Sequence, residues 1–298
     1  MTIKLTFLGT AGQIPSVQRN HTAVLLTFKG ENILIDCGEG TQRQFRKAGL
    51  NPCKVTKILI THIHGDHVFG LPGLLSTLNL SGYNKKLHVY GPRGTRRFME
   101  SFLGLSKVKR SFEIKIEEVS GKFFEGKDFY LEAEKMKHGI PTNAYSFIKK
   151  GQIRIDKNKM KKAKLSQGPH LLKLKQGKDI SFKGKKYKAK NLTFKEEDKK
   201  ISFVLDTLNN QRILKIAKDS DLFICEASFS DELKEQAKEH LHMTSKQAAE
   251  AAKKAKVKKL VLTHLSQRYE SNPGLILKEA KKIFKNSILV KDLDVLEI

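Results

Sequence analysis

Short apolar runs recur along the chain, and their polar borders predict an alternation of strands and helices. Apolar runs that alternate with polar residues, or that end abruptly at a turn, predict strands, and apolar residues three or four positions apart predict helices. The predicted strands cover residues 3–7, 22–28, 32–36, 57–60, 87–90, 112–119, 129–138, 201–205, 222–225, 259–264 and 288–290. The predicted helices cover residues 41–48, 71–80, 96–103, 230–240, 245–254 and 274–284. This order indicates an α/β protein with helices outside its sheets.

Two of the predicted strands end in the same way. The apolar run 57–60 leads through a threonine to His62, and the run 259–262 leads through a threonine to His264. The repeat predicts two similar β/α halves that meet face to face. In open α/β sheets, ligand sites lie at the carboxyl ends of the strands, which is where both histidines stand.

The residues after the first of these strands carry metal-binding chemistry. The run Thr61-His62-Ile63-His64-Gly65-Asp66-His67 holds three histidines and an aspartate. His62 and His64 are two positions apart, so in an extended backbone they point the same way and can bind one ion. Asp66 and His67 are adjacent and point apart, so they suit a second ion better. Ligands of this kind without thiolate favour zinc, with manganese and iron as alternatives.

A polar surface loop is the alternative interpretation of this run, and for a lone histidine it would be preferred. Four ligand-type side chains within six positions, at a strand end and before an apolar helix, favour a metal site instead. The spacing therefore predicts a dinuclear centre. Asp36, at the end of the predicted strand 32–36, is a candidate partner for a ligand histidine, and a capping role is its alternative.

Length and composition narrow the class of protein. With 298 residues, of which 39% are hydrophobic and 30% are charged, the chain suffices for one globular domain with a substantial core. No apolar run approaches the length of a membrane span, and the first residues read as a strand rather than a signal peptide, so we expect a soluble cytoplasmic protein. Cys37, Cys53 and Cys225 are widely separated. Such spacing argues against a disulfide framework and a zinc ribbon.

The net charge of +26 and the pI near 9.9 indicate a polyanionic partner. A lysine-rich proteome, which would raise the charge of every protein, is the alternative explanation. The location of the charge favours the first. In residues 149–190, Asp156 and Asp179 are the only acids among many lysines. We expect this segment to bury little apolar surface and to project from the body, as an RNA-binding arm or, alternatively, as a solubilising insertion.

Several segments together resemble the metallo-β-lactamase fold and, within it, the short form of ribonuclease Z, the tRNA 3′-processing endonuclease. They are the metal-binding run itself, Phe7-Leu8-Gly9-Thr10-Ala11-Gly12, Asp36-Cys37-Gly38-Glu39-Gly40-Thr41-Gln42 and Thr263-His264-Leu265-Ser266-Gln267-Arg268-Tyr269. The similarity covers nearly the whole chain in order. It implies a four-layer αββα sandwich in which residues 1–298 form a single domain, with 149–190 as a protruding basic arm that binds tRNA.

The resemblance implies two zinc ions per subunit, with manganese or iron as alternatives, and assigns them seven ligands. One ion takes three histidines, the other takes an aspartate and two histidines, and a further aspartate bridges both. In that order the ligands are His62, His64 and His138; Asp66, His67 and His264; and Asp206. Asp206 follows a predicted strand, and a helix cap is the alternative role for an aspartate in that position.

The resemblance also assigns catalytic residues. It implies that Asp66 orients or deprotonates the nucleophile and that His242 donates a proton to the leaving oxygen or stabilises the scissile phosphate. Imidazole suits proton donation because it titrates near the working pH. Glu226, in Cys225-Glu226-Ala227-Ser228, is expected to fix His242 or a metal ligand. His240 lies two positions from His242, and a surface position for both is the alternative.

Further residues are expected to contact RNA, some near the metal centre and some in the arm. They are Arg19, Asn20, Arg268 and Tyr269, and in the arm Gly168, Pro169, Lys173 and Lys175. Val17 departs from the family, which often has a basic residue in this loop, and the loop is associated with discriminating transcripts that already carry CCA. Family members are usually homodimers in which the arm of one subunit serves the active site of the other.

These observations lead to one hypothesis and two alternatives. The hypothesis is a zinc-dependent endoribonuclease that removes the 3′ trailer from precursor tRNA. It would cut after the discriminator nucleotide and leave a 3′-hydroxyl on the tRNA and a 5′-phosphate on the trailer. The first alternative is a hydrolase of the same fold that acts on a small ester, lactone or phosphodiester, since one fold hosts many reactions. The second is a non-catalytic RNA-binding scaffold with a structural metal.

Overall fold

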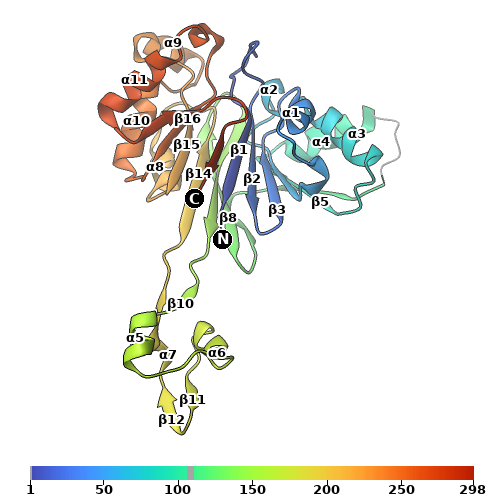
Figure 1. Ribbon diagram of the computed structural model, residues 1–298. Helices are drawn as coiled ribbons and strands as arrows, with labels where there is room; N and C mark the ends of the chain where they lie inside the picture. The colour runs from blue at the N-terminus through green and yellow to red at the C-terminus, as the bar shows by residue number, and fades with distance from the viewer. Residues whose placement is uncertain (1, 106–110) are drawn as a thin grey trace.

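Two β-sheets lie face to face in the computed structural model, which describes residues 2–105 and 111–298 (Figure 1). Within these residues each sheet has seven strands. The first, in the order β18-β1-β2-β3-β4-β5-β6, consists of β1 (Lys4–Gly9), β2 (Ala23–Phe28), β3 (Glu31–Ile35), β4 (Lys57–Leu59), β5 (Leu87–Gly91), β6 (Ile114–Glu118) and β18 (Val295–Glu297). The second, in the order β17-β16-β15-β14-β9-β8-β7, consists of β7 (Gly121–Glu125), β8 (Phe129–Lys137), β9 (Pro141–Lys149), β14 (Lys199–Val204), β15 (Leu222–Glu226), β16 (Leu260–Thr263) and β17 (Ser287–Leu289).

Helices cover the outer face of each sheet, so the metallo-β-lactamase fold expected from the sequence, an α/β sandwich of four layers, is confirmed (Figure 1). The first half contributes α1 (Thr41–Lys47), η1 (Pro52–Lys54), α2 (Gly65–Val68), α3 (Leu71–Leu80) and α4 (Thr95–Leu105). The second half contributes α8 (Gln211–Ala217), η2 (Asp231–Leu233), α9 (Lys234–Glu239), α10 (Ser245–Lys254), η3 (Gln267–Tyr269) and α11 (Gly274–Ile283).

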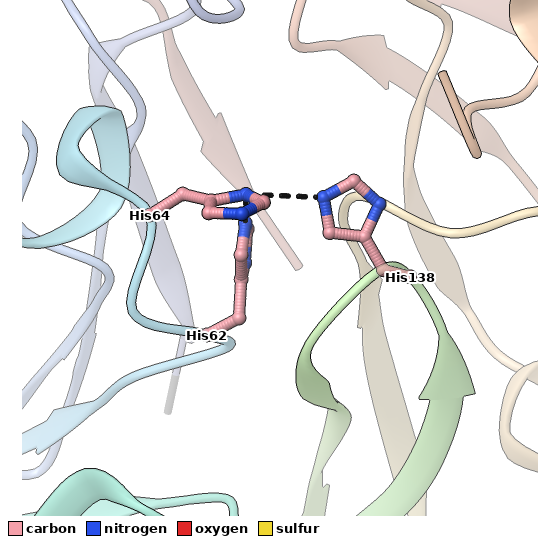
Figure 2. A group of neighbouring side chains, drawn as sticks. All are labelled: His62, His64 and His138. Atoms are coloured by element: carbon pink, nitrogen blue, oxygen red, sulfur yellow. Dashed lines mark hydrogen bonds between the residues drawn. The ribbon is translucent and has the colours of Figure 1, made fainter. Parts of the chain in front are cut away.

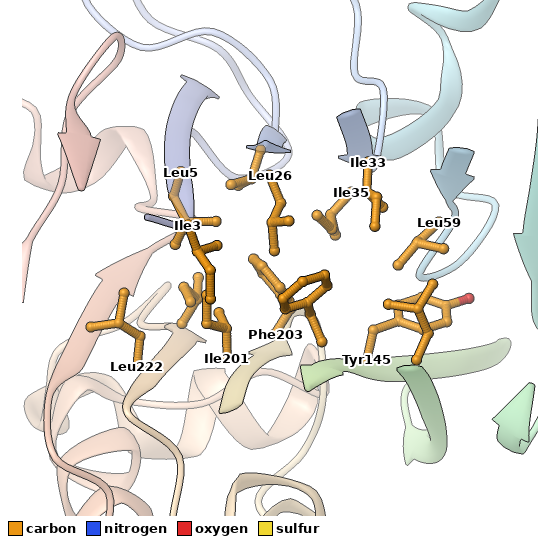
Figure 3. Close-up of a cluster of buried hydrophobic side chains, with 14 of the residues drawn as sticks. Ile3, Leu5, Leu26, Ile33, Ile35, Leu59, Tyr145, Ile201, Phe203 and Leu222 are labelled. Atoms are coloured by element: carbon orange, nitrogen blue, oxygen red, sulfur yellow. The ribbon is translucent and has the colours of Figure 1, made fainter. Parts of the chain in front are cut away.

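The main core lies between the two sheets. Leu5, Leu26 and Ile35 of the first sheet face Ile201 and Phe203 of the second, and all five are buried (Figure 3). Two further apolar clusters lie outside this core, one between the first sheet and α1, α3 and α4, the other between the second sheet and α8, α10 and α11. The central strands of each sheet are therefore buried on both faces, which is why strands such as β15 and β16 read as unbroken apolar runs.

Local signals set several element boundaries where the sequence predicts them. Helix α1 ends just before Gly49, whose φ of +65° suits the glycine that closes a helix. Helix α10 begins with a capping box, in which the Thr244 side chain accepts from Gln247 N and the Gln247 side chain accepts from Thr244 N.

The parallel strands bring their carboxyl ends to one edge of the sandwich. Strands β3, β4, β5 and β6 are parallel, as are β14, β15, β16 and β17. Because the ends of both sets meet at this edge, residues far apart in sequence are gathered there.

The basic segment projects from the body and contains β10 (Ile153–Ile155), α5 (Lys157–Lys162), α6 (Leu171–Lys175), β11 (Ile180–Phe182), β12 (Lys185–Tyr187), α7 (Ala189–Leu192) and β13 (Thr193–Lys195) (Figure 1). Its extent and its burial differ from the sequence-based expectation. Pairing of β10 with β13 extends the projection to Lys195. A small core of its own buries Leu165, Leu174, Ile180, Ala189 and Leu192. The lysines between these positions hid the apolar pattern.

Several of the described elements were not predicted, among them β7, β9, β18 and α8. Strand β9 was missed because it is buried almost throughout yet contains the polar residues Thr142, Asn143 and Ser146. Their side chains bond within the fold, as when Ser146 Oγ lies 2.8 Å from Ser202 Oγ.

A membrane-spanning helix, which must be both long and apolar, is not found in the parts of the chain that are described.

Candidate metal centre

Polar residues at the ends of five strands meet at one edge of the sandwich. Asp36 follows β3, the metal-binding run follows β4, Asp206 and His264 follow β14 and β16, and Glu226 ends β15. Asp36, Asp206 and His264 have φ values of 57°, 43° and 57°. This left-handed conformation is uncommon for residues other than glycine, costs roughly 1–3 kcal/mol and concentrates at functional sites.

The second sheet holds the metal-binding run in place. Tyr145 is fully buried, and its hydroxyl donates to Ile60 O at 2.7 Å. Asn143 N donates to Thr61 O at 2.9 Å. Both bonds come from β9, so the run after β4 is fixed to the opposite sheet immediately before its first histidine.

His62, His64 and His138 form the first ligand group (Figure 2). His62 Nε2 lies 3.0 Å from His64 Nδ1, and His138 Nε2 lies 3.2 Å from the same atom. The convergence of His62 and His64 that their spacing predicts is present. His138 arrives from the end of β8 in the other sheet. His62 is buried and His64 is exposed, so this group opens toward solvent on one side.

Asp66, His67, His264 and Asp206 form the second ligand group, and all four are buried. His67 Nε2 lies 3.3 Å from Asp66 Oδ2, and His264 Nε2 lies 3.5 Å from the same oxygen. His264 Nε2 also lies 3.0 Å from Asp206 Oδ1.

Asp206 lies between the two groups. Its Oδ2 is 3.6 Å from His62 Nε2 and 3.4 Å from His67 Nε2, and its Oδ1 faces His264. One carboxylate is therefore within reach of both ligand groups, which is the position that the family resemblance predicts for it.

The donor set fits bound divalent metal. His67 Nε2, His264 Nε2 and Asp206 Oδ1 are buried and make no hydrogen bond. An unsatisfied buried polar atom costs about 1–3 kcal/mol, so three in one place call for a shared partner. Imidazole and carboxylate ligands without thiolate suit zinc.

The electrostatics of the site favour positive charge at its centre. Burial by itself raises the pKa of Asp206, but His264 and His67 hold that pKa well below its usual value. Burial likewise lowers the pKa of His264, and Asp206 outweighs it and raises that pKa to about 10. Burial and the charge of His67 keep the pKa of His62 well below its ordinary value. The carboxylates thus create the negative field that holds a cation.

Asp36 orients His67. His67 Nδ1 donates to Asp36 Oδ2 at 2.7 Å, and Thr61 donates to the same carboxylate from both its N–H and its hydroxyl at 2.7 Å. Of the two roles that the sequence left open for Asp36, partner of a ligand histidine is the one its contacts favour. The bond keeps the proton on Nδ1 and leaves Nε2 free to bind metal.

A second polar network orients His264 and His242. Ser228 Oγ lies 2.9 Å from His264 Nδ1 and donates to Glu226 Oε2 at 2.8 Å. Glu226 is fully buried and accepts from Thr207 N at 2.6 Å through Oε1. His242 Nδ1 lies 2.9 Å from Glu226 Oε2, and Glu226 and Asp206 raise the pKa of His242 although burial opposes them. Glu226 therefore contacts His242 directly and a ligand indirectly.

A pocket opens over the centre. Besides the ligands His64, Asp66, His138, Asp206 and His264 it is lined by His242, Phe229, Arg268 and the backbone around Gly12 to Ile14. The Arg268 guanidinium lies 5.2 Å from the centroid of the Phe229 ring. The pocket thus pairs a deep acceptor cluster with a cationic and aromatic rim.

The other residues expected to contact RNA near the centre have different surroundings. Tyr269 is buried and its hydroxyl accepts from Ser230 N at 2.9 Å. Arg19 is buried as well, and its Nη1 donates to Thr10 Oγ1 and to Val290 O at 2.7 Å. Both polar groups are thus used inside the fold, and an RNA contact of Arg19 and Tyr269 stays a prediction.

Asn20 also uses its side chain within the protein, since Nδ2 donates to Glu39 O at 2.6 Å. In the arm, Gly168 and Pro169 form the turn before α6, and Lys173 and Lys175 on α6 are exposed. The arm leaves the body at the far ends of β9 and β14, away from the strand ends that carry the metal ligands (Figure 1).

Sequence reasoning missed the orienting residues Thr61, Ser228 and Thr207. Each is a small polar residue next to a ligand or a catalytic candidate in the chain, and this is the only local signal that marks them. Pocket residues Gln13, Ile14 and Phe229 were missed too, because nothing in their neighbours along the chain distinguishes them.

Known proteins with similar sequences and folds cover almost the whole chain. The profile of the family described as "Anti-Pycsar protein Apyc1" matches residues 3–284. Ribonuclease Z of Methanosarcina mazei is 36% identical over 99% of this chain and 98% of its own length, and ribonuclease Z of Listeria monocytogenes is 38% identical over 99% of both. The crystal structure of the short form of human tRNase Z matches with a TM-score of 0.72 and 30% identity, covering 98% of each chain.

Proposed function

The chain belongs to the ribonuclease Z family, and we propose that it is a zinc-dependent endoribonuclease acting on precursor tRNA. It also matches the family described as Anti-Pycsar protein Apyc1. It removes the 3′ trailer by cutting after the discriminator nucleotide. The products are a tRNA with a 3′-hydroxyl and a trailer with a 5′-phosphate. The chain is a ribonuclease Z-like metallohydrolase.

The observation that carries the proposal is the pair of ligand groups joined by Asp206. His62, His64 and His138 would hold one ion, and Asp66, His67 and His264 the other. Two cations held there would supply a hydroxide nucleophile near neutral pH and would neutralise the oxygens of a phosphodiester.

The chain's own residues have distinct tasks in this reaction. Asp66 lies in the pocket with its Oδ2 between His67 and His264, where it orients the attacking water and accepts its proton. The water oxygen bonds to phosphorus, and the bond from phosphorus to the 3′ oxygen of the upstream nucleotide breaks. His242 gives that oxygen its proton. Glu226 holds the other ring nitrogen of His242 and so aims Nε2 at the pocket.

The arm supplies affinity for the RNA. The arm has a small apolar core, which fixes the arrangement of its exposed lysines, among them Lys173 and Lys175. Neutralising phosphates with such a surface releases counterions and favours binding without reading sequence.

We further propose that the protein acts as a homodimer in which one subunit's arm serves the metal centre of the other. Lys149 ends β9 and Lys199 begins β14, while His138 and Asp206 stand at the opposite ends of the adjoining strands. Within one subunit the arm therefore points away from the metal centre. In a dimer, the arm of the second subunit can reach this centre instead. Mass measurement in solution tests this directly, because a monomer that cleaves with full efficiency contradicts the arrangement.

A small phosphodiester is the second candidate substrate, because the two ligand groups by themselves suit any phosphodiester and one fold hosts many reactions. An enzyme for such a substrate needs the metal centre but not the arm. Lys149 pairs with Lys199 across β9 and β14, so residues 150–198 can be replaced by an Asn-Gly hairpin turn.

The deciding experiment gives the purified protein a 3′-extended precursor tRNA, with and without chelator, and maps the cut. We expect one cut after the discriminator nucleotide, lost with chelator and restored by zinc. The armless variant should lose this cleavage and keep hydrolysis of bis(p-nitrophenyl) phosphate. Hydrolysis of bis(p-nitrophenyl) phosphate by a parent protein that does not cut the precursor tRNA would favour the small-substrate enzyme. Binding of tRNA without cleavage by the zinc-loaded protein would favour the scaffold. A parallel substrate ending in CCA shows whether the exposed Val17 has altered that discrimination.

A further inference from the structure

The loop between β1 and β2, residues 10–22, forms one wall of the pocket over the metal centre. Gly12, Gln13 and Ile14 line the pocket. A Cβ atom added to Gly12 would lie 3.3 Å from Cε1 of His264, so the loop runs directly against that ligand ring. The position of this wall decides how closely a substrate strand can approach the centre.

The outer part of this loop makes few contacts with the body. Val17 is fully exposed and Ile14 is half exposed. The backbone bond from Ser16 N to Arg19 O, 2.9 Å long, stays within the loop. The ends of the loop therefore fix it, and one end is also bonded to the body, where Gly12 N donates to Leu265 O at 3.0 Å.

A single carboxylate near the C-terminus holds both ends. Thr10 Oγ1 donates to Asp292 Oδ1, and Asn20 N donates to Asp292 Oδ2, each at 2.7 Å. Gln44 Nε2 of α1 donates to the same Oδ2 at 2.7 Å. Asp292 lies in the turn between β17 and β18. A residue near the C-terminus therefore holds a loop near the N-terminus. Hydrogen bonds to a carboxylate are the strong ones.

Arg19 extends the same network. Its Nη1 donates to Thr10 Oγ1 and to Val290 O, each at 2.7 Å. The Thr10 hydroxyl thus accepts from a guanidinium and donates to a carboxylate, using both roles of a hydroxyl group. Both ends of the loop are thereby bound to the segment 290–292.

We infer that Asp292 is a positioning residue, which fixes the wall formed by Gly12, Gln13 and Ile14 and thereby sets where an RNA strand lies over the metal centre. Asp292 touches no reacting atom, so it acts through Thr10 and Asn20. The effect on RNA rests on the proposed function, whereas the effect on the loop does not.

The test uses the full-length, zinc-loaded protein and the substitution Asp292→Asn, which keeps the shape but places a donor where one of the accepted hydrogen bonds ends. Thr10→Val, which removes only the hydroxyl, is a second variant. Hydrogen exchange reports the loop through the amides of Ala11 and Ser16, which donate to Asn20 O and Arg19 O. Steady-state kinetics give kcat/KM for precursor tRNA and for bis(p-nitrophenyl) phosphate, and the readout is the first value divided by the second.

In Asp292→Asn and Thr10→Val we expect faster exchange in residues 11–20 and a fall of about tenfold or more in that ratio, with a rise in KM for the tRNA, because a small displacement of the wall misplaces a long substrate. Loss of metal or of overall stability would lower both kcat/KM values together and leave the ratio unchanged. Asp294→Asn is the matched control, since Asp294 Oδ2 accepts from Lys291 N in its own turn. It should leave exchange and kinetics as in the parent protein.

Parent-like exchange and a parent-like ratio in Asp292→Asn would overturn the inference. Failure of the parent protein to cut precursor tRNA would refute the proposed function instead. In that case the exchange of residues 11–20 alone decides whether Asp292 holds the loop.

Discussion

Asp36→Asn isolates the orientation of one metal ligand. Asp36 accepts three hydrogen bonds of 2.7 Å, from Thr61 N, from the Thr61 hydroxyl and from His67 Nδ1. Its φ of 57° is one that asparagine tolerates well, so the substitution leaves the backbone unstrained, as alanine would not.

The geometry dictates how the new amide sits. Because Thr61 N can only donate, the amide oxygen takes the place of Oδ1, and the NH2 group takes the place of Oδ2 opposite His67 Nδ1. Two donors then face each other. His67 relieves this by moving its proton to Nε2, which is the nitrogen that faces Asp66 and Asp206 and would bind metal.

We therefore expect the affinity of the second ligand group for zinc to fall about tenfold to a hundredfold, which corresponds to about 1.4–2.8 kcal/mol. The first group, His62, His64 and His138, should keep its affinity because Asp36 contacts none of its members in the hydrogen bonds described. Titration of metal-free protein with zinc against a competing chelating dye resolves the two steps.

The matched control is Asp219→Asn. Asp219 has a similar φ of 55° but lies exposed and far from the centre, so it reports the same chemical change on the same backbone conformation. We expect no change in either zinc affinity. Two unchanged binding steps in Asp36→Asn would refute the argument that Asp36 fixes the tautomer of His67.

Three further predictions concern the whole enzyme. Asp66→Ala should abolish precursor tRNA cleavage with little change in tRNA affinity, because affinity belongs to the arm; equal losses in parallel binding and cleavage assays would contradict that division. Removal of zinc by a chelator should stop cleavage while circular dichroism stays native-like, because the apolar cores hold the fold; unfolding on chelation would indicate a structural metal. Binding of tRNA should weaken steeply with salt, with a log–log slope of several units that becomes shallower when residues 150–198 are replaced by a turn; equal slopes for the two proteins would remove the arm from the electrostatic argument.

The sequence carried much of the architecture because its signals are local. Periodicity predicted most strands and helices, including α3 and α10 with their observed bounds. Elements with buried polar residues escaped this signal, as β9 shows. The arm misled in the other direction, because its lysines masked the spaced apolar residues, such as Leu165 and Leu174, that form its small core.

What the sequence by itself determined was the chemistry at each strand end: histidine and aspartate at known spacing after β4, and single ligand-type residues after β8, β14 and β16. The tertiary structure decided which of these side chains share a centre. Asp206 meets His62 and His264 only because two sheets pack face to face, and Asp36 reaches His67 only through the pairing of β3 with β4. Arg19 turned inward because Val290 lies beside it in space, 271 positions away in the chain. Periodicity and turn chemistry act over a few residues, whereas such contacts depend on strand pairing and sheet packing, which no local pattern encodes.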